Sequence, residues 1–258
     1  METIYSFEAP PGATYPAAGP IFSQGGVIYG TTSAGGVNYS CGSFFNCGTV
    51  YELAPPASTG GAWTETTLYS FNNGAGVEPI TSVVLGAGGK LYGWAPNGNY
   101  GNGAVYDLTP PASAGGAWTE TLLYSFQGPP NDGGTPVGNL AIGENGSLYG
   151  ATAFGGTYDQ GTVFELAPPA SAGSYWVPTV LYSFRGDGDG TNPGAGVAIG
   201  ENGAIYGTTE GGGALGFGTV FALNLAAGVW EEKVLVSMGS TLDRPVGIAL
   251  AHNGALDG

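Results

Sequence analysis

The chain has 258 residues, of which 51 are glycine and 18 are proline, while hydrophobic residues make up 42% and aromatic residues 12%. This apolar content excludes a disordered chain, because a disordered chain has too little apolar surface to bury. Nineteen acidic residues against four basic ones give a net charge of −15, which excludes a nucleic-acid partner, since phosphate binding needs clustered lysine and arginine. No apolar run approaches the ~18 residues of a membrane span.

The predicted elements follow one another in a fixed order that begins near residue 5. The first is Tyr5-Ser6-Phe7, the second is Pro16 with a small apolar run, the third is Tyr29-Gly30, and the fourth is Gly48 to Tyr51. These landmarks return with a period of 54 to 64 residues. Their later copies begin at Tyr69, Pro79, Tyr92, Gly103, Tyr124, Pro136, Tyr149, Gly161, Tyr182, Pro193, Tyr206, Gly218, Val236 and Pro245. Repetition on this scale predicts a repeat architecture.

Each landmark predicts one short β-strand. In the third repeat the strands are expected at 139–142, 147–152, 161–166 and 177–184. Asn145-Gly146 stands between the first two, and an Asn-Gly pair between apolar runs is a strong hairpin signal, because both turn residues are expected to take positive φ. No stretch of even ten residues shows the apolar period of a helix. The sequence therefore predicts an all-β protein.

Four antiparallel strands in each repeat are typical of a β-propeller blade. One such sheet cannot bury its faces alone, so neighbouring repeats must cover it. We predict a single β-propeller domain over 1–258 with about five four-stranded antiparallel blades, the last one incomplete. The repeats are expected at 16–71, 79–126, 136–184 and 193–238, with 245–258 and 1–7 sharing the incomplete blade. Because that blade lacks a third strand, we expect the chain to be a fragment of a longer protein.

The landmarks resemble the GloVer tandem repeat of bacterial exported proteins. In the third repeat the residues that carry the resemblance are Leu148-Tyr149-Gly150-Ala151-Thr152, Gly155-Gly156, Gly161-Thr162-Val163-Phe164-Glu165-Leu166 and Leu181-Tyr182-Ser183-Phe184. The resemblance covers nearly the whole chain, and it is specific because the four elements recur in order. It implies an extracellular or cell-surface location, and it carries no catalytic residues.

The two cysteines, Cys41 and Cys47, lie in one loop rich in glycine, serine and asparagine. This placement favours a disulfide that ties a surface loop in an oxidising compartment. Two free thiols are the alternative. A metal site is a third interpretation, but no histidine or second cysteine pair lies nearby to complete four ligands.

One face of the predicted propeller varies more than the other and is the candidate binding face. The spacing from the second-strand tyrosine to the third-strand valine is 21 residues in the first repeat and 13 or 14 in the others. Loops of variable length on one face commonly carry binding residues. The candidate ligand-binding residues are Trp94, Asn97, Asn99, Tyr100, Tyr158, Asp159, Arg185, Asp187 and Asp189. Aromatic, amide and carboxylate groups together suit a sugar, although ordinary polar loops would look the same.

Two sets of residues within the repeats need separate interpretation. The tryptophans that begin each fourth strand recur in every repeat and are therefore predicted to pack between blades; they are Trp63, Trp118, Trp176 and Trp230. Trp94 breaks the small-residue pattern of its repeat position, so we predict that it contacts a ligand. Asp187, Asp189 and Asn192 resemble the start of a calcium loop, but the twelfth position, which needs glutamate, holds Ala198. A solvated Asp-Gly turn is the alternative, and no cofactor other than calcium is suggested.

Catalysis has little support in the sequence. The single histidine, His252, leaves no Ser-His-Asp or Cys-His set to assemble. Glu52, Asp107 and Glu165 share one position of the third strand, so each is interpreted as a blade element. The leading hypothesis is a non-enzymatic exported module that binds a carbohydrate or another protein, or that serves as a structural module of the cell surface. The alternative is a carbohydrate-active enzyme, which should show two close carboxylates in a cleft and a raised pKa in one of them.

Overall fold

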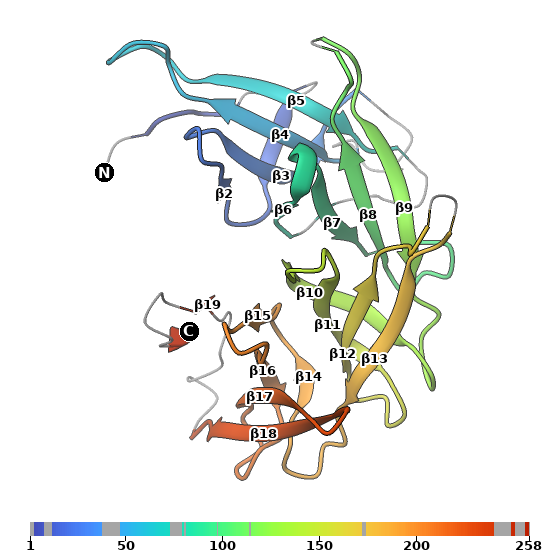
Figure 1. The fold of residues 1–258 in the computed structure, drawn as a ribbon. Helices are drawn as coiled ribbons and strands as arrows, with labels where there is room; N and C mark the ends of the chain where they lie inside the picture. The colour runs from blue at the N-terminus through green and yellow to red at the C-terminus, as the bar shows by residue number, and fades with distance from the viewer. Residues whose placement is uncertain are drawn as a thin grey trace. The chain divides into compact units, whose positions relative to one another are not determined.

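The computed structural model describes residues 3–7, 12–37, 47–72, 79, 81–96, 98–113, 115–171 and 174–239, together with the backbone of 249–250 and 256–257. Every described element is a strand except a short 3-10 helix at Ala87–Gly89. The chain divides into two compact units, Met1–Ser125 and Phe126–Gly258. Each unit holds two of the four complete antiparallel sheets drawn in Figure 1.

The first unit contains two sheets that follow each other along the chain. In the first sheet the strand order is β1-β3-β4-β5, and the short β2 also pairs with β3, so β1 and β2 share the first strand position of the sheet. In the second sheet the order is β6-β7-β8-β9. The bounds are β1 Ala13–Pro16, β2 Ile21–Phe22, β3 Ile28–Gly35, β4 Thr49–Ala54, β5 Thr64–Ser70, β6 Val84–Leu85, β7 Leu91–Ala95, β8 Ala104–Thr109 and β9 Thr119–Ser125.

The second unit repeats this plan. One sheet has the order β10-β11-β12-β13, the next has β14-β16-β17-β18 with β15 pairing β16, and a hairpin of β19 and β20 follows. The bounds are β10 Gly133–Ile142, β11 Leu148–Gly155, β12 Thr162–Ala167, β13 Val177–Ser183, β14 Thr191–Pro193, β15 Ala198–Ile199, β16 Ile205–Gly211, β17 Thr219–Ala226, β18 Val229–Ser237, β19 Ala249–Leu250 and β20 Leu256–Asp257. Four complete meanders and a fifth begun as a hairpin agree with the predicted blade count.

The predicted strands of the third repeat lie close to β11, β12 and β13, but the first strand is longer than predicted. β10 begins at Gly133, six residues before the expected start, and Pro136 pairs with Thr152 inside it. The early half of β10 was missed because glycine and proline are weak strand formers. A register shift between Val137 and Ala141 bends the strand and divides it into two halves.

The hairpin turns differ from the prediction in one respect. Gly146 has a φ of 80°, but Asn145 is not among the residues with positive φ. Gly146 N–H donates to the Gly143 carbonyl at 2.9 Å, and the Asn145 side chain accepts from Ser147 N–H at 3.0 Å. The loop is therefore longer than a two-residue turn, and only its glycine needs the left-handed conformation. The prediction of positive φ at both residues was wrong.

The core of each unit lies between its two sheets. In the first unit Val50 of β4 and Phe71, which directly follows β5, pack with Leu91, Tyr106 and Leu108 of the next sheet. The second unit repeats this cluster with Val163, Phe184, Ile205, Phe221 and Leu223.

The phenylalanine of the Tyr-Ser-Phe motif makes the central contact of each core. The Phe71 ring meets Tyr106 edge-on at a centroid distance of 5.3 Å, and the Phe184 ring meets Phe221 in the same way at 5.1 Å. Near the N-terminus the Phe7 ring meets Tyr51 at 4.8 Å. Four-stranded antiparallel sheets packed face to face in chain order are the blades of a β-propeller.

Candidate functional site

A pocket of about 420 Å³ opens in the second unit beside β13 and β18, the outermost strands of its two blades. β13 contributes four consecutive residues, β18 contributes one tryptophan, and the rest come from the connections before β10, between β11 and β12, and after β13. The pocket is lined by Pro130, Asn131, Thr157, Tyr158, Val180, Leu181, Tyr182, Ser183, Arg185 and Trp230. Three aromatic rings and several hydroxyl, amide and guanidinium groups therefore face one cavity, and such a mixture suits a ligand with apolar and hydroxylated faces.

The connection between β11 and β12 holds Tyr158 at the pocket. Asp159 has a φ of 54°, and its carboxylate accepts a hydrogen bond from Gly155 N–H at 2.8 Å. Thr157 N–H donates to the Ser183 hydroxyl at 3.4 Å, which ties the connection to β13. The Tyr158 side chain is 51% exposed. Of the two residues predicted here, Tyr158 lines the pocket, while Asp159 stabilises the turn that carries it.

The connection after β13 is organised by Asp189. Its carboxylate accepts from Arg185 N–H at 3.0 Å, from Gly186 N–H at 3.0 Å and from the Tyr182 hydroxyl at 2.7 Å. Asp187 and Arg185 are exposed, and only Arg185 lines the pocket. Asn192 begins the next blade in β14, where its backbone N–H donates to the Gln160 carbonyl. No group of three or more His, Cys, Asp or Glu residues in the described ranges could hold a metal ion, and calcium binding by Asp187, Asp189 and Asn192 stays a prediction.

Asp189 also interacts with Glu232, an acidic residue of β18 that the sequence did not single out. Burial, and secondarily the negative charge of Asp189, raises the pKa of Glu232 to about 7. One oxygen of the Glu232 carboxyl is buried without a hydrogen-bond partner. Burial and the hydrogen bond to Asp189 raise the pKa of the Tyr182 hydroxyl well above its usual value of 10. Neither Asp189 nor Glu232 is among the residues that line the pocket.

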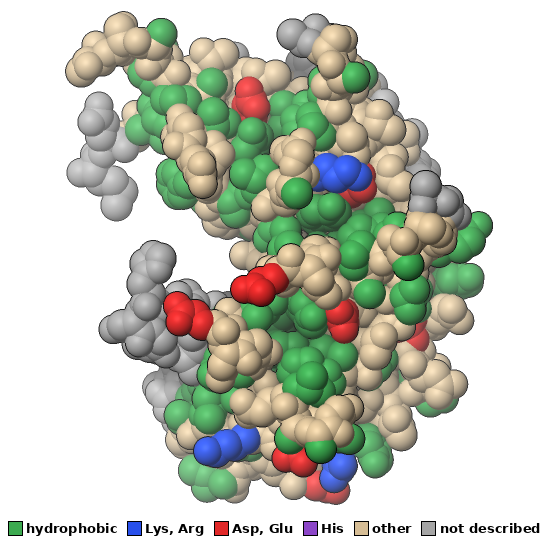
Figure 2. Space-filling model, viewed as in Figure 1, with side chains coloured by type: hydrophobic (Ala, Val, Ile, Leu, Met, Phe, Trp, Pro, Cys, Tyr) green, Lys and Arg blue, Asp and Glu red, His purple; other side chains and the backbone are tan. Residues whose placement is uncertain are grey.

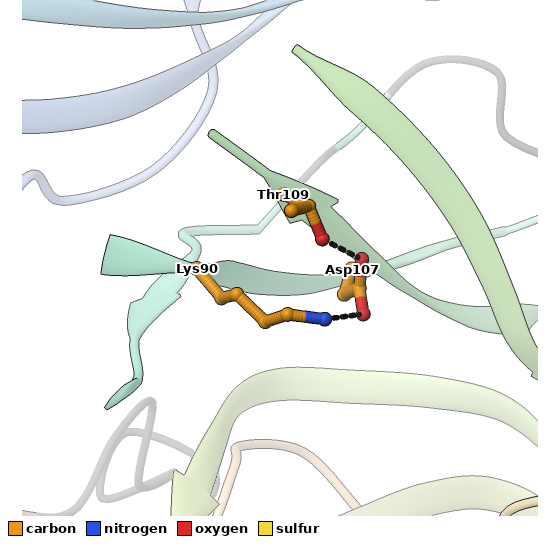
Figure 3. A network of polar contacts seen from close by, with 3 residues as sticks. All are labelled: Lys90, Asp107 and Thr109. Carbon is orange, nitrogen blue, oxygen red and sulfur yellow. Dashed lines mark hydrogen bonds and ion pairs between the residues drawn. The ribbon is translucent and has the colours of Figure 1, made fainter. Parts of the chain in front are cut away.

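The carboxylates of the third strand are blade elements, as predicted. Each stands directly opposite the tyrosine of the second strand, in the pairs Glu52 with Tyr29, Asp107 with Tyr92, and Glu165 with Tyr149. Figure 3 shows the one that is most buried. The Lys90 ammonium donates to Asp107 at 2.8 Å and the Thr109 hydroxyl donates to its other oxygen at 3.1 Å.

The residues predicted in the first unit do not join this pocket. Trp94 is only 2% exposed, so the prediction that it contacts a ligand was wrong. Its position is a buried slot in other blades too, where Thr31, Ala151 and Thr208 are each no more than 1% exposed. Tyr100 is 62% exposed in the connection between β7 and β8, and the neighbouring Asn99 N–H donates to the Ser125 hydroxyl at 3.3 Å. Asn97 lies outside the described residues.

The tryptophans of the fourth strands were predicted to pack between blades, and the core clusters show such packing for Trp63, Trp118 and Trp230. Trp63, Trp118 and Trp230 are partly buried and pack against core clusters. Trp230 nevertheless also lines the pocket. Sequence reasoning missed this second role because the tryptophan recurs at the same position of every repeat, and recurrence favours a packing role over a ligand contact. Tyr182, which belongs to the repeated Tyr-Ser-Phe motif, was missed for the same reason.

The structure describes only one of the two cysteines of the predicted disulfide. Cys47 is fully buried in the core cluster of the first unit, beside Val50 and Phe71. Cys41 lies outside the described residues. The pairing of the two cysteines therefore stays a prediction.

The family model described as the Gloeobacter/Verrucomicrobia repeat matches residues 95–258, which confirms the resemblance drawn from the landmarks. Two solved structures are similar in fold, a Trypanosoma rangeli sialidase with a TM-score of 0.47 and the Trypanosoma rangeli sialidase in complex with 2,3-difluorosialic acid with a TM-score of 0.48. Both are 15% identical to this chain. The matches cover 86% and 88% of this chain and span 38% and 40% of the sialidases. No curated protein sequence matches. In the part of the chain that the structure describes, no helix has the length and hydropathy to cross a membrane.

Proposed function

The chain belongs to the Gloeobacter/Verrucomicrobia repeat family, and we propose that it is a non-enzymatic binding module that takes a carbohydrate in the pocket beside β13 and β18. The observation that carries the proposal is the lining of this pocket. Tyr158 and Trp230 offer aromatic faces on which a sugar ring can stack, while Asn131, Thr157 and Arg185 offer hydrogen-bonding groups for its hydroxyls. Tyr158 is exposed, so a ligand can reach it without any rearrangement of the core.

Binding to an oligosaccharide panel, followed by calorimetry on the best ligand, tests the proposal. We expect Tyr158→Ala to weaken binding at least about fivefold, because a lost stacking contact is worth about 1 kcal/mol or more. Tyr100→Ala is the matched control, since Tyr100 is also an exposed tyrosine, lies in the corresponding connection of another blade and is outside the pocket. Absence of binding to every oligosaccharide, or equal losses in the two variants, would contradict the proposal.

The alternative function is a carbohydrate-active enzyme, and the raised pKa of Glu232 beside Asp189 is the observation that favours it. An acid with a pKa near 7 can act as a general acid at neutral pH. The position of the pair argues the other way, because neither residue lines the pocket and one Glu232 oxygen is buried. Release of reducing ends from the bound oligosaccharide separates the two functions. Turnover that disappears in Glu232→Gln would support the enzyme.

The proposal includes an extracellular or cell-surface location and a disulfide between Cys41 and Cys47. Support comes from the family resemblance to exported repeat proteins and from the placement of both cysteines at the ends of one short segment. Alkylation of the denatured protein, read by intact mass, tests the disulfide. We expect no alkyl groups before reduction and two after it, whereas two alkyl groups without reductant would exclude the bond.

A further inference from the structure

The residues that line the pocket beside β13 and β18 include one cationic side chain and no anionic one, although the whole chain is strongly acidic. The chain carries 19 acidic and only four basic residues. Among the described residues that line the pocket there is one arginine, Arg185, and no aspartate or glutamate. Acidic side chains are therefore absent from the lining of this pocket although they outnumber basic ones almost fivefold in the sequence. A local reversal of charge of this kind favours an anionic group on the ligand.

The guanidinium of Arg185 is available to such a group. The Arg185 side chain is exposed. Among the described residues the structure shows one ion pair, between Lys90 and Asp107, and Arg185 takes no part in it. Asp189, in the same connection, directs its carboxylate to the backbone N–H groups of Arg185 and Gly186 and to the Tyr182 hydroxyl. These three hydrogen bonds satisfy the Asp189 carboxylate without the guanidinium.

We infer that the pocket selects a sugar that carries a carboxylate, with Arg185 as the residue that recognises the charge. This inference rests on the proposed carbohydrate-binding function and narrows its ligand class. The planar guanidinium matches a carboxylate with two parallel hydrogen bonds, which a sugar hydroxyl cannot accept. Tyr158 and Trp230 remain available for the sugar ring, so the charge and the ring are recognised by different side chains of one pocket.

The test compares a uronic-acid oligosaccharide with its carboxyl-reduced counterpart, which has the same linkage and length but a primary alcohol in place of each carboxylate. Calorimetry on the full chain gives the ratio of the two dissociation constants. We expect the wild-type protein to bind the uronate at least about tenfold more tightly, because hydrogen bonds to charged groups are worth roughly that factor or more. The preference should shrink as the salt concentration rises.

Three variants make the test specific to Arg185. Arg185→Gln should bring the ratio close to one, because it weakens binding of the uronate much more than binding of the reduced sugar. Arg185→Lys should recover only part of the preference, because an ammonium lacks the two-pronged geometry. Lys233→Gln removes the same charge from an exposed residue of β18 that does not line the pocket, and it should leave the ratio unchanged.

Each result decides between the inference and its failure. Equal binding of the two sugars by the wild-type protein, or a preference that survives in Arg185→Gln, overturns the carboxylate inference while the carbohydrate-binding function stands. Binding of neither sugar by a folded protein overturns the carboxylate inference, and the oligosaccharide panel then decides the carbohydrate-binding function. A preference lost equally in Arg185→Gln and Lys233→Gln would show a general charge effect and would also overturn the assignment to Arg185.

Discussion

The tyrosine of the Tyr-Ser-Phe motif bonds to a different carboxylate in each unit. Tyr69 donates to Glu120 of the next blade at 2.8 Å. Tyr182, at the same repeat position, donates instead to Asp189 in the connection that follows its own strand, at 2.7 Å. Glu232 occupies the repeat position of Glu120, since each pairs with the leucine of the third strand, and it is left with a buried oxygen that has no partner. Asp189 thus makes in the second unit the tyrosine contact that Glu120 makes in the first unit.

The raised pKa of Glu232 predicts a pH effect on stability. The pKa of Glu232 is about 7 in the folded protein against 4.5 in a model compound, so the folded state binds the additional proton more tightly. A raised carboxyl pKa means that the unfolded state loses its proton first, and stability therefore falls as the pH rises from about 5 to 7. Glu232→Gln should remove this contribution, so that its stability relative to wild type increases from pH 5 to pH 8.

Urea unfolding at several pH values measures this difference directly. Glu231→Gln is the matched control, because Glu231 is the exposed neighbour of Glu232 on β18. Its stability relative to wild type should stay nearly constant over the same pH range. A constant difference for Glu232→Gln as well would show that Glu232 is ionised normally in the folded protein.

A buried pair of threonines joins the second and third strands in three of the four blades. The hydroxyls lie 2.8 Å apart in Thr32 with Thr49 and in Thr152 with Thr162, and 2.9 Å apart in Thr209 with Thr219. The Thr152 hydroxyl also donates to the Phe154 carbonyl and accepts from Thr162 N–H. In the second blade two alanines, Ala95 and Ala104, stand opposite each other at this position and are fully buried. A blade thus tolerates the loss of both hydroxyls together.

The alanine pair predicts strong coupling between the two threonines. Thr152→Ala alone should cost about 1–3 kcal/mol, because it leaves the buried Thr162 hydroxyl and N–H without their partner. Adding Thr162→Ala removes the orphaned hydroxyl, so the double variant should be less destabilised than the sum of the single variants. Urea unfolding of the two single variants and the double variant completes the cycle. Additive losses would mean that the two hydroxyls contribute independently.

At the scale of the element, the last residue of the Tyr-Ser-Phe motif joins one blade to the next. Phe184 is fully buried and its ring meets Phe221 of the following sheet edge-on. Phe184→Ala should destabilise the protein by about 3–5 kcal/mol, since it leaves a cavity between two sheets. Phe154→Ala is the control, because Phe154 is 50% exposed at the end of β11 and its loss should cost well under 1 kcal/mol. Similar losses in both variants, measured by urea unfolding, would contradict this role of Phe184.

The elements that the sequence predicts well are those whose apolar residues alternate within one strand. β11, β12 and β13 begin within a residue of their predicted starts, because each carries its own apolar landmark. The first half of β10 could not be predicted, since Gly133, Gly134 and Pro136 carry no strand signal and are held by pairing with β11.

The candidate site likewise contains residues that the sequence predicts and residues that it does not. The rule that variable connections share a face predicted Tyr158 and Arg185, and both line one pocket. Trp94 was misassigned because a single sequence does not show that its repeat position is buried in other blades. Glu232 could not be found, because its raised pKa arises from burial and from the approach of Asp189, and neither is visible in the sequence.

At the scale of the whole molecule, most charged side chains are negative. The formal net charge is −15, and Figure 2 shows Lys and Arg atoms as only a few isolated blue groups on the face in view. Lys90 with Asp107 is the single ion pair that the structure shows within its described residues. Added salt therefore screens mainly the repulsion between acidic side chains, because few attractive pairs of opposite charge are present to be weakened.

The melting temperature should consequently rise as sodium chloride is raised from about 0.01 M to 0.15 M, because the Debye length falls from about 30 Å to about 8 Å over this range. A shift of a few degrees corresponds to about 1 kcal/mol for a chain of this size. Glu144→Gln combined with Glu201→Gln neutralises two exposed turn residues of neighbouring blades and should flatten the salt dependence. A melting temperature that falls with salt would mean that local ion pairs, rather than net repulsion, dominate the electrostatic free energy of folding.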